Sequence, residues 1–338
     1  MKILVDINHP AHVHFFKYLI QEMSKQGHDV LVTATRKDIA FQLLDAYRIE
    51  YVDLGSYGTS LGEKAFKLLW IDLKMLAVVK RFNPDYLLGI ASFRCAHAAW
   101  LLHKVSYIFT DTEHATEQIM LYKPFATKIM TPACFTTSFG SRQVKYKGYH
   151  ELAYLHPQRF TPNPDVLKEI GGAPDDKFFI IRFVSWEASH DIGQKGFSLE
   201  GKRTLIRLLK KYGRIIISSE TPLPTEFESY RMSISPIEMH DLLYYATMYI
   251  GEGGTMASEA AVLGTPAILV NTLTAGTFQE LEYRYHLLKS FGDETEFFEH
   301  VDQFVGNSNL KAEWRTKQQQ LLHDTIDVTQ WMLELLKI

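Results

Sequence analysis

The sequence predicts an α/β protein with two doubly wound, Rossmann-like domains that face each other across a cleft. Short apolar runs alternate with longer amphipathic runs along most of the 338 residues, and no hairpin signal joins the apolar runs. The alternation is interrupted once, near the middle of the chain. Strands that alternate with helices form βαβ units and parallel sheets, and the chain is long enough for two domains of ordinary size.

The first half of the chain supplies one set of alternating elements. The helical spacing of Val13, Phe16, Leu19 and Met23 predicts the first helix, and Asn83-Pro84 marks the end of the third. The strands expected in this half are residues 2–7, 29–35, 50–55, 85–90, 106–111 and 127–132. The helices expected between them are residues 11–28, 41–49, 62–82 and 95–104.

The pattern is interrupted between residues 147 and 176 by several proline and glycine residues, among them Pro157, Pro162, Pro164, Gly171, Gly172 and Pro174, which predicts a linker. Further strands are expected at residues 177–185, 214–219, 247–252 and 266–271, with helices at 199–213, 235–246 and 254–263. The predicted division is a domain at 1–150, a linker at 151–176, a second domain at 177–309, and a C-terminal helix at 310–338 that can pack across both domains.

Composition excludes several classes of protein. A formal net charge of -3 argues against a general nucleic-acid binder, which usually carries a basic excess. Two cysteines rule out a disulfide framework and a four-cysteine zinc site, and they suit a reducing compartment. The chain shows neither a signal peptide nor an uncharged run of the ~20 residues that cross a bilayer. We therefore expect a cytoplasmic protein.

The stretch "YIGEGGTMASEAAVLGTPAILVN" places a glycine pair, Gly253 and Gly254, between a strand and a helix. Glycines there let the backbone approach a ligand closely, and the N–H groups and dipole of the helix favour an anion. No Walker lysine follows, and Met256 breaks the dinucleotide fingerprint. The glycines alone leave two interpretations open, an anion site and a tight structural turn.

Thr255, Ser258 and Glu259 lie in the first turns of that helix. A carboxylate one turn beyond a bound diphosphate can accept hydrogen bonds from a ribose diol. The alternative is that Glu259 lies on a solvated helix face and interacts only with the helix dipole. Ligands of doubly wound sheets bind beyond the carboxyl ends of the strands, where this motif stands.

Two loops of the first domain also follow strand ends. His9 and His12 follow the first strand, and a neutral imidazole there could take a proton from an attacking hydroxyl. Asp111 and Glu113, next to His114, follow the fifth strand, where a carboxylate can orient a histidine. The alternative for Asp111 is a helix N-cap. No metal site is expected, because neither an Asp-x-Asp signature nor a matched histidine spacing occurs.

Three segments carry a resemblance to a known family. "ATMYIGEGGTMASEAAVLGTPAILV" resembles the nucleotide-sugar motif of GT-B enzymes, especially the N-acetylglucosaminyltransferase of peptidoglycan lipid synthesis and the non-hydrolysing UDP-N-acetylglucosamine 2-epimerases. "SYIFTDTEHATEQIMLYKPFATKIMTP" resembles a segment of their N-terminal domain. With the opening "DINHPAHVHFF", nearly the whole chain is similar to an uncharacterised prokaryotic family of predicted GT-B glycosyltransferases. The N-terminal loop departs from the lipid-synthesis relatives, whose corresponding loop is rich in glycine.

The resemblance implies a GT-B fold with an N-terminal acceptor domain and a C-terminal domain that binds a nucleotide diphosphate sugar, most often UDP-linked. It implies that Glu259 holds the ribose, and that Gln279 and Glu280, with Thr277 beside them, contact the sugar. Basic and polar groups near the first strand of the second domain could neutralise the diphosphate. These groups are Arg182, Ser185, His190 and Lys195.

The resulting expectation is an inverting, metal-independent glycosyltransferase in glycan or cell-envelope synthesis. Its substrates would be the nucleotide sugar and an unknown glycan or lipid-linked acceptor, with no cofactor, and His12 or Glu113 would be the base. One alternative is a 2-epimerase in which Asp111, Glu113 and His190 move protons. A second alternative is a nucleotide-sugar-binding protein without turnover, in which Trp186 and the altered loops block the acceptor side.

The helix "EKAFKLLWIDLKMLAVVKRF" combines basic residues with large apolar ones. A basic amphipathic helix can lie on an anionic membrane, here the inner face of the cell membrane. It can equally be an ordinary surface helix of the sheet.

Overall fold

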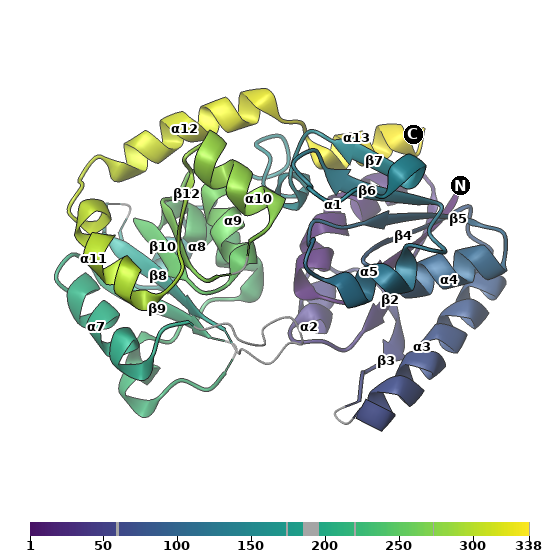
Figure 1. Cartoon of the computed structure of the whole chain (residues 1–338), viewed down its shortest axis with the longest axis horizontal. Coiled ribbons are helices and arrows are strands. Elements are labelled where there is room, and N and C mark those ends of the chain that lie inside the picture. The colour runs from purple at the N-terminus through teal and green to yellow at the C-terminus, as the bar shows by residue number, and fades with distance from the viewer. Residues whose placement is uncertain (59–60, 174, 185–195, 220, 273, 338) are drawn as a thin grey trace. The chain divides into compact units, whose positions relative to one another are not determined.

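A computed structural model of the protein describes residues 1–58, 61–173, 175–184, 196–219, 221–272 and 274–337. The chain divides into two compact units. Unit 1 comprises Met1–Arg159 and Ile326–Ile338, and unit 2 comprises Phe160–Thr325. Each unit has its own parallel sheet covered by helices, so the predicted fold of two α/β domains is confirmed (Figure 1).

Unit 1 contains, among the described residues, a seven-stranded parallel sheet of order β3-β2-β1-β4-β5-β6-β7. The strands are β1 (Lys2–Ile7), β2 (Asp29–Thr35), β3 (Tyr51–Gly55), β4 (Tyr86–Ile90), β5 (Val105–Phe109), β6 (Lys128–Pro132) and β7 (Gln143–Tyr146). The helices are α1 (Pro10–Lys25), α2 (Ala40–Ala46), α3 (Leu61–Phe82), α4 (Phe93–Leu101), α5 (Thr116–Tyr122) and α13 (Val328–Leu335). Two short 3-10 helices, η1 (Gly140–Arg142) and η2 (His150–Ala153), flank β7.

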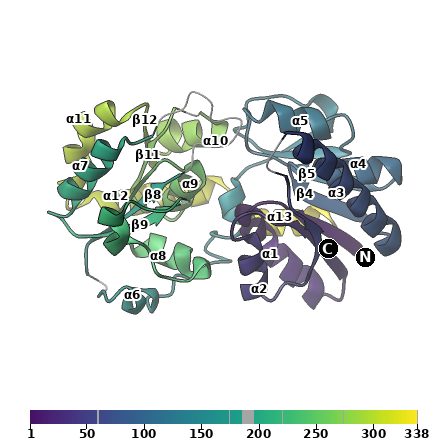
Figure 2. The ribbon, with the colours of Figure 1, turned by 90° about the horizontal axis from the view of Figure 1, so that it is seen from below.

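The helices of unit 1 cover both faces of its sheet. α1, α2 and α13 lie together on one face, and α3, α4 and α5 lie side by side on the other (Figure 2). Right-handed crossovers that leave β1 in opposite directions along the sheet place their helices on opposite faces. The central strands are therefore buried on both faces, which explains the continuous apolar run Ile3–Val5 in β1.

A buried charge network fixes the strand order at the carboxyl end of β1. Asp6 Oδ2 accepts hydrogen bonds from Arg94 Nη2 and Ser92 Oγ, both at 2.6 Å, and Asp6 Oδ1 accepts one from Thr33 Oγ1 at 2.9 Å. Asp6 and Arg94 are both inaccessible to solvent. Removing either partner of a buried ion pair leaves an uncompensated charge, so this network ties β1 to β2 and to the start of α4.

Unit 2 contains, among the described residues, a five-stranded parallel sheet of order β12-β11-β10-β8-β9. The strands are β8 (Phe178–Phe183), β9 (Arg214–Ser219), β10 (Met248–Gly251), β11 (Ala267–Val270) and β12 (Leu288–Phe291). The α-helices are α6 (Val166–Glu169), α7 (Leu199–Leu209), α8 (Met239–Tyr245), α9 (Gly254–Val262), α10 (Gly276–Gln279), α11 (Glu294–Val305) and α12 (Leu310–Asp324). The described part of unit 2 also contains two 3-10 helices, η4 (Thr225–Tyr230) and η5 (Pro236–Glu238), and a π-helix, η6 (Glu280–Arg284).

The C-terminal stretch forms two helices, one in each unit. α12 belongs to unit 2, and α13 packs on unit 1 against α1 and η2. Asp327 caps α13 by accepting from Gln330 N–H, and the Arg159 guanidinium lies 2.6 Å from the Asp327 carboxylate. The boundary between the units follows Arg159, and η2, at the start of the segment expected as a linker, is buried in unit 1. No helix in the described part of the chain is both long and apolar enough to cross a membrane.

Candidate functional site

The topology of unit 2 predicts where its ligand binds. β9 lies on one side of β8 and β10 on the other, so the strand order reverses between β8 and β10. Ligands of doubly wound sheets bind at such a switch point, beyond the carboxyl ends of the strands. Gly251 of β10 is in register with Arg182 of β8, and α9 begins three residues after Gly251.

The N-terminus of α9 has no side-chain cap. Gly253 is the N-cap residue and provides no side-chain hydrogen bond to the first turn. Tyr249 Oη donates to the Gly253 carbonyl at 3.0 Å, and Asn271 Nδ2 donates to the Glu252 carbonyl at 2.9 Å. These two bonds hold the backbone that leads into the helix through its carbonyl groups. The first N–H groups of a helix, in contrast, have no partner within it.

The two glycines allow neighbouring side chains to lie against the backbone. A Cβ at position 253 would contact Val184 at 3.3 Å and Arg182 at 3.5 Å, and a Cβ at position 254 would overlap with the ring of Phe278. Phe278 belongs to α10 and was not among the residues expected from the sequence. The glycine pair is therefore required for close packing, whichever ligand the helix meets.

Glu259 lies in a buried pair with a histidine. Its Oε1 is 3.0 Å from Nε2 of His240, which α8 supplies, and Glu259 is only 4 % exposed. The alternative of a solvated helix face is therefore wrong for Glu259. Ser258, one residue earlier, is also buried, and its hydroxyl has no hydrogen-bond partner among the described residues. Such a buried polar atom needs an explanation, and a bound ligand is one.

A second carboxylate, Glu252, was not predicted from the sequence. It is 1 % exposed, and its two oxygens accept hydrogen bonds from Val184 N–H at 2.9 Å and Phe197 N–H at 2.7 Å. Glu252, which directly follows β10, therefore holds Val184, just after β8, and Phe197, just before α7. Between Val184 and Phe197, the expected site residues Ser185, His190 and Lys195, and Trp186 with them, lie outside the described residues.

The remaining residues expected to bind the nucleotide sugar differ in their exposure to solvent. Arg182 Nη1 donates to Ser218 Oγ on β9 at 2.6 Å. Thr277 is buried, whereas Thr255 and Gln279 are exposed. Glu280 begins the π-helix η6 and pairs with Arg284 at 2.9 Å.

At the carboxyl edge of the sheet in unit 1, Asp111 pairs with a histidine that the sequence did not single out. Asp111 Oδ2 lies 3.0 Å from His150 Nδ1. The Nε2 atom of His150 is buried and has no hydrogen-bond partner among the described residues. His150 begins η2 and packs against the ring of Phe15 in α1, with centroids 4.6 Å apart. A carboxylate on one imidazole nitrogen orients the ring and leaves the other nitrogen for proton transfer.

His12 belongs to the same cluster. It is buried in the first turn of α1, and its Nδ1 has no hydrogen-bond partner in the described part of the chain. Burial lowers the pKa of His12 well below its usual value, and the neighbouring His9 and His150 lower it further, while Asp111 opposes them. His12 is therefore neutral at physiological pH. His9 caps α1, because its Nδ1 accepts from Ala11 N–H at 3.2 Å.

Asp111 keeps its charge in this cluster. Burial alone would raise the pKa of the Asp111 carboxyl, but His150, with smaller contributions from Thr112 and His12, lowers it to about 2. Asp111 is thus an anion over the whole physiological range. The Oε1 atom of Glu113, the other expected base, accepts a hydrogen bond from Thr136 N–H at 3.1 Å.

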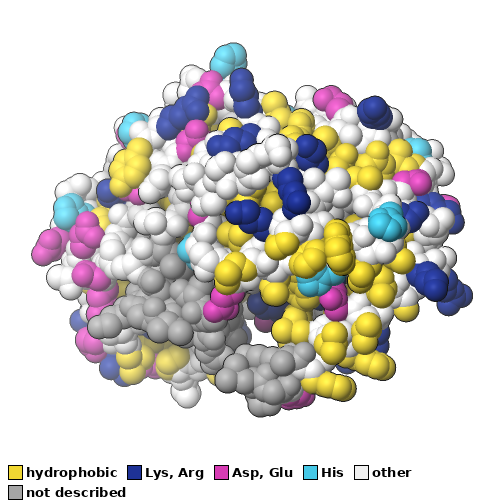
Figure 3. Space-filling view, turned by 45° about the vertical axis from the view of Figure 1, so that its right-hand side comes forward, with side chains coloured by type: hydrophobic (Ala, Val, Ile, Leu, Met, Phe, Trp, Pro, Cys, Tyr) yellow, Lys and Arg dark blue, Asp and Glu magenta, His cyan; other side chains and the backbone are white. Residues whose placement is uncertain are grey.

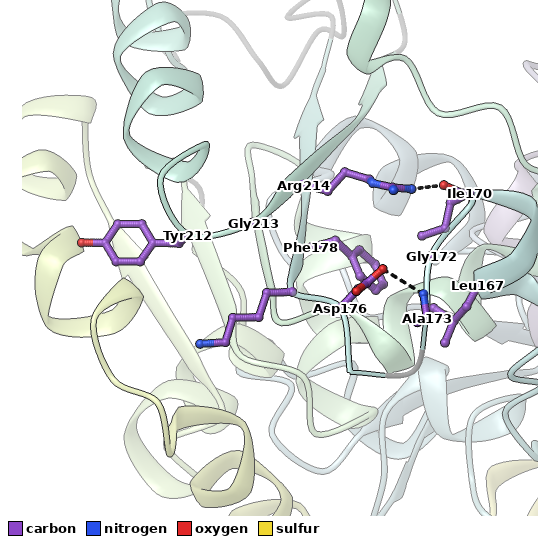
Figure 4. A pocket seen from close by; sticks show the side chains of 10 residues that line it. Leu167, Ile170, Gly172, Ala173, Asp176, Phe178, Tyr212, Gly213 and Arg214 are labelled. Atoms are coloured by element: carbon purple, nitrogen blue, oxygen red, sulfur yellow. Dashed lines mark hydrogen bonds between the residues drawn. The ribbon is translucent and has the colours of Figure 1, made fainter.

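Two other observations concern a metal site and a hollow elsewhere in unit 2. Among the residues that the structure describes, no group of three His, Cys, Asp or Glu side chains is placed to hold one metal ion. A hollow of about 350 Å³ lies in unit 2 near Phe178 and Arg214, at the amino ends of β8 and β9 (Figure 4). Its Arg214 guanidinium already donates to the carbonyls of Ile170 and Gly171. This hollow is at the sheet edge opposite to the predicted ligand site.

Comparison with solved structures places this fold among GT-B proteins. The UDP-GlcNAc 2-epimerase from Neisseria meningitidis bound to UDP-GlcNAc aligns with a TM-score of 0.72 and 15 % identity over 100 % of both chains. The UDP-GlcNAc 2-epimerase from Methanocaldococcus jannaschii aligns with a TM-score of 0.64 and 13 % identity over 94 % of this chain and 98 % of that one. The spinosyn rhamnosyltransferase SpnG, complexed with spinosyn aglycone, aligns with a TM-score of 0.63 and 13 % identity over 100 % of both chains.

Sequence comparison gives a more specific relationship. An uncharacterised protein of Methanocaldococcus jannaschii is 25 % identical over 284 residues, which cover 79 % of this chain and 81 % of the relative. Residues 1–278 match the family described as "Protein of unknown function (DUF354)", and the chain belongs to that family.

Proposed function

We propose that the protein is a glycosyltransferase that takes a sugar from a nucleoside diphosphate sugar and transfers it to an acceptor hydroxyl. The observation that carries the proposal is the start of α9, where an N-terminus without a side-chain cap is followed by Ser258 and Glu259. The Ser258 hydroxyl is buried and has no hydrogen-bond partner among the residues that the structure describes. Anions bind helix N-termini through backbone N–H groups and the helix dipole. A carboxylate held one turn further along suits the ribose hydroxyls of the same ligand.

The residues around α9 support a charged leaving group. The diphosphate would accept hydrogen bonds from the N–H groups at Gly254 and Thr255, with the Arg182 side chain alongside the glycine pair. Positive charge and N–H dipoles at this place stabilise the negative charge that grows on the diphosphate in the transition state. His240 holds one oxygen of Glu259, so the carboxylate is oriented before the nucleotide binds. The similar epimerase from Neisseria meningitidis is bound to UDP-GlcNAc, which favours UDP as the nucleotide.

The cluster in unit 1 supports proton transfer from the acceptor. The acceptor oxygen forms a bond to the anomeric carbon as the bond from that carbon to the diphosphate breaks, and the hydroxyl proton passes to a base. We assign that base to His150 Nε2, oriented by Asp111, with the neutral His12 beside it. Both histidines have a buried nitrogen without a partner among the described residues, which is the hydrogen-bonding capacity that a bound hydroxyl would use. A single displacement of this kind inverts the anomeric centre and needs no metal ion.

A 2-epimerase is the second candidate. Its chemistry removes a proton at C2 with loss of the nucleoside diphosphate from C1. It then returns the diphosphate to C1 on the face that it left and adds a proton to C2 from the opposite face. One sheet edge carries a carboxylate and two imidazoles, those of Asp111, His150 and His12. These groups are enough to remove the proton from C2 and to add one back.

One assay separates these functions. The protein is incubated with a panel of nucleoside diphosphate sugars, with and without a lipid and glycan extract, and the nucleotide and sugar products are separated. We expect free nucleoside diphosphate only when the acceptor extract is present, with loss of activity in Asp111→Asn and no change in Glu117→Gln, an exposed carboxylate of α5. A new sugar isomer without acceptor would identify the epimerase, and binding without any product would identify a binding protein.

A further inference from the structure

The exposed apolar side chains of this protein are concentrated on one part of unit 1. In the part of the chain that the structure describes, thirteen large hydrophobic side chains are exposed, and eight of them belong to α3, α4 and α5. They include Phe66, Leu69, Trp70 and Leu73 of α3, Trp100 of α4 and Met120 of α5. Single exposed apolar residues are normal on a protein surface, but a contiguous group marks an interaction site.

Helix α3 is apolar on two opposite sides. Ile71, Met75 and Val79 point inward and are buried. Trp70 and Leu73 lie on the outward side and are 53 % and 51 % exposed. A helix that is apolar on one side only is satisfied by packing on its sheet, so the outward side of α3 has an apolar surface that the fold of unit 1 does not use.

The three helices form one continuous surface, which we call the α3–α5 face. His97 of α4 bridges them, since its Nδ1 lies 2.7 Å from Asp72 of α3 and its Nε2 lies 3.0 Å from the Leu121 carbonyl of α5. The ring of Trp100 packs on Phe125 with centroids 5.3 Å apart. Figure 3, which brings the right-hand part of Figure 1 forward, shows apolar side chains gathered on this side with Lys and Arg among them.

The charge of this face differs from that of the whole chain. α3 carries five basic residues and two acidic ones, whereas the chain has a formal net charge of -3. Lys80 and Arg81 end α3, Lys104 follows α4, and Lys123 follows α5. Because the three helices each connect parallel strands, these basic residues stand at the same end of the face. The face thus combines exposed tryptophans with a basic rim.

We propose that the α3–α5 face docks on an anionic lipid bilayer. Apolar and tryptophan side chains enter the interface between headgroups and acyl chains, and lysine and arginine contact the anionic headgroups. Charge complementarity favours lipid over a second copy of this chain, which would bring the same basic rims together. This docking concerns the surface of the bilayer, and it is independent of the proposed enzymatic reaction.

The test is sedimentation of the full chain with vesicles of phosphatidylcholine, with and without phosphatidylglycerol. We expect binding to the anionic vesicles that salt weakens, and an affinity at least about tenfold lower in Trp70→Gln/Leu73→Gln. Lys80→Glu/Arg81→Glu should lose the preference for anionic vesicles, by about fivefold or more for each charge removed. The matched control is Leu199→Gln/Tyr212→Gln, which replaces two exposed apolar residues of unit 2 and should bind as the parent does.

Two results would overturn the proposal. One is that the parent protein does not bind vesicles at low salt, although it and all variants have the same melting temperature and are therefore folded. The other is a dimer in sedimentation velocity that Trp70→Gln/Leu73→Gln converts to a monomer, because a second copy would then cover this face.

Discussion

The carboxyl edges of the two sheets have the same architecture but a different chemistry. In unit 1 the edge carries titratable side chains, those of His12, Asp111 and His150, to which we assign proton transfer. In unit 2 the edge carries glycines and backbone groups, and its carboxylates, Glu252 and Glu259, are buried and held by partners. The same fold therefore presents titratable side chains at the edge in one unit, and glycines and backbone groups at the edge in the other.

The largest effect should come from the proton-transfer edge. Asp111→Asn keeps the shape of the side chain but removes the charge that orients His150. We expect kcat/KM of the transfer reaction to fall by roughly 10²–10⁴, the usual contribution of a general base. Calorimetry should show that the affinity for UDP is unchanged.

The matched control is Glu117→Gln, and a further comparison is Glu113→Gln, which tests the second candidate base. If Asp111→Asn instead weakened UDP binding and left turnover intact, the roles of the two edges would have to be exchanged. If Glu113→Gln alone lost the rate, the base would be Glu113.

The next effect concerns the anion-binding edge. Glu259→Gln should weaken binding of UDP by about 1–3 kcal/mol, since hydrogen bonds to a charged group are lost. Glutamine is preferred to alanine, because alanine would leave His240 buried without its partner and would destabilise unit 2 as well. Isothermal titration with UDP measures the affinity, and thermal melting checks the fold. Unchanged affinity with a lower melting temperature would make Glu259 a structural residue only.

Gly254→Ala tests the same edge through packing. The new methyl group would overlap with the ring of Phe278, so the ring or the first turn of α9 must move. Overpacking of this kind costs about 1–3 kcal/mol, and we expect part of it to appear as weaker UDP binding. Combining it with Phe278→Leu should restore affinity if the ring is the obstacle. No recovery in the double variant would mean that the backbone of Gly254 itself is needed.

The sequence predicted most of the elements and some of the site, but not the pairs that complete it. Alternation of apolar runs was sufficient for ten of the twelve described strands. It missed β7 and β12, which lie at the edges of their sheets and are only partly buried. Glu259 could be singled out because it follows the glycine pair at a fixed spacing. His240 and His150 could not, since each reaches its carboxylate from a different element, 19 and 39 residues away in the sequence. Their partners are fixed by tertiary packing, which local patterns do not contain.

The smallest effect is a pH dependence of stability that belongs to His12 in unit 1. Its pKa in the folded protein is lowered well below the ordinary value of 6.5, mainly by burial. The unfolded chain therefore binds a proton first as the pH falls, and the stability that neutral His12 contributes above about pH 6.5 is lost as the pH falls through its lowered pKa. The melting temperature should decrease from pH 7 to pH 5, and it should decrease less in His12→Gln, which cannot titrate. Identical melting profiles for the parent and His12→Gln would show that His12 is not buried in its neutral form, and would remove it from the proposed acceptor site.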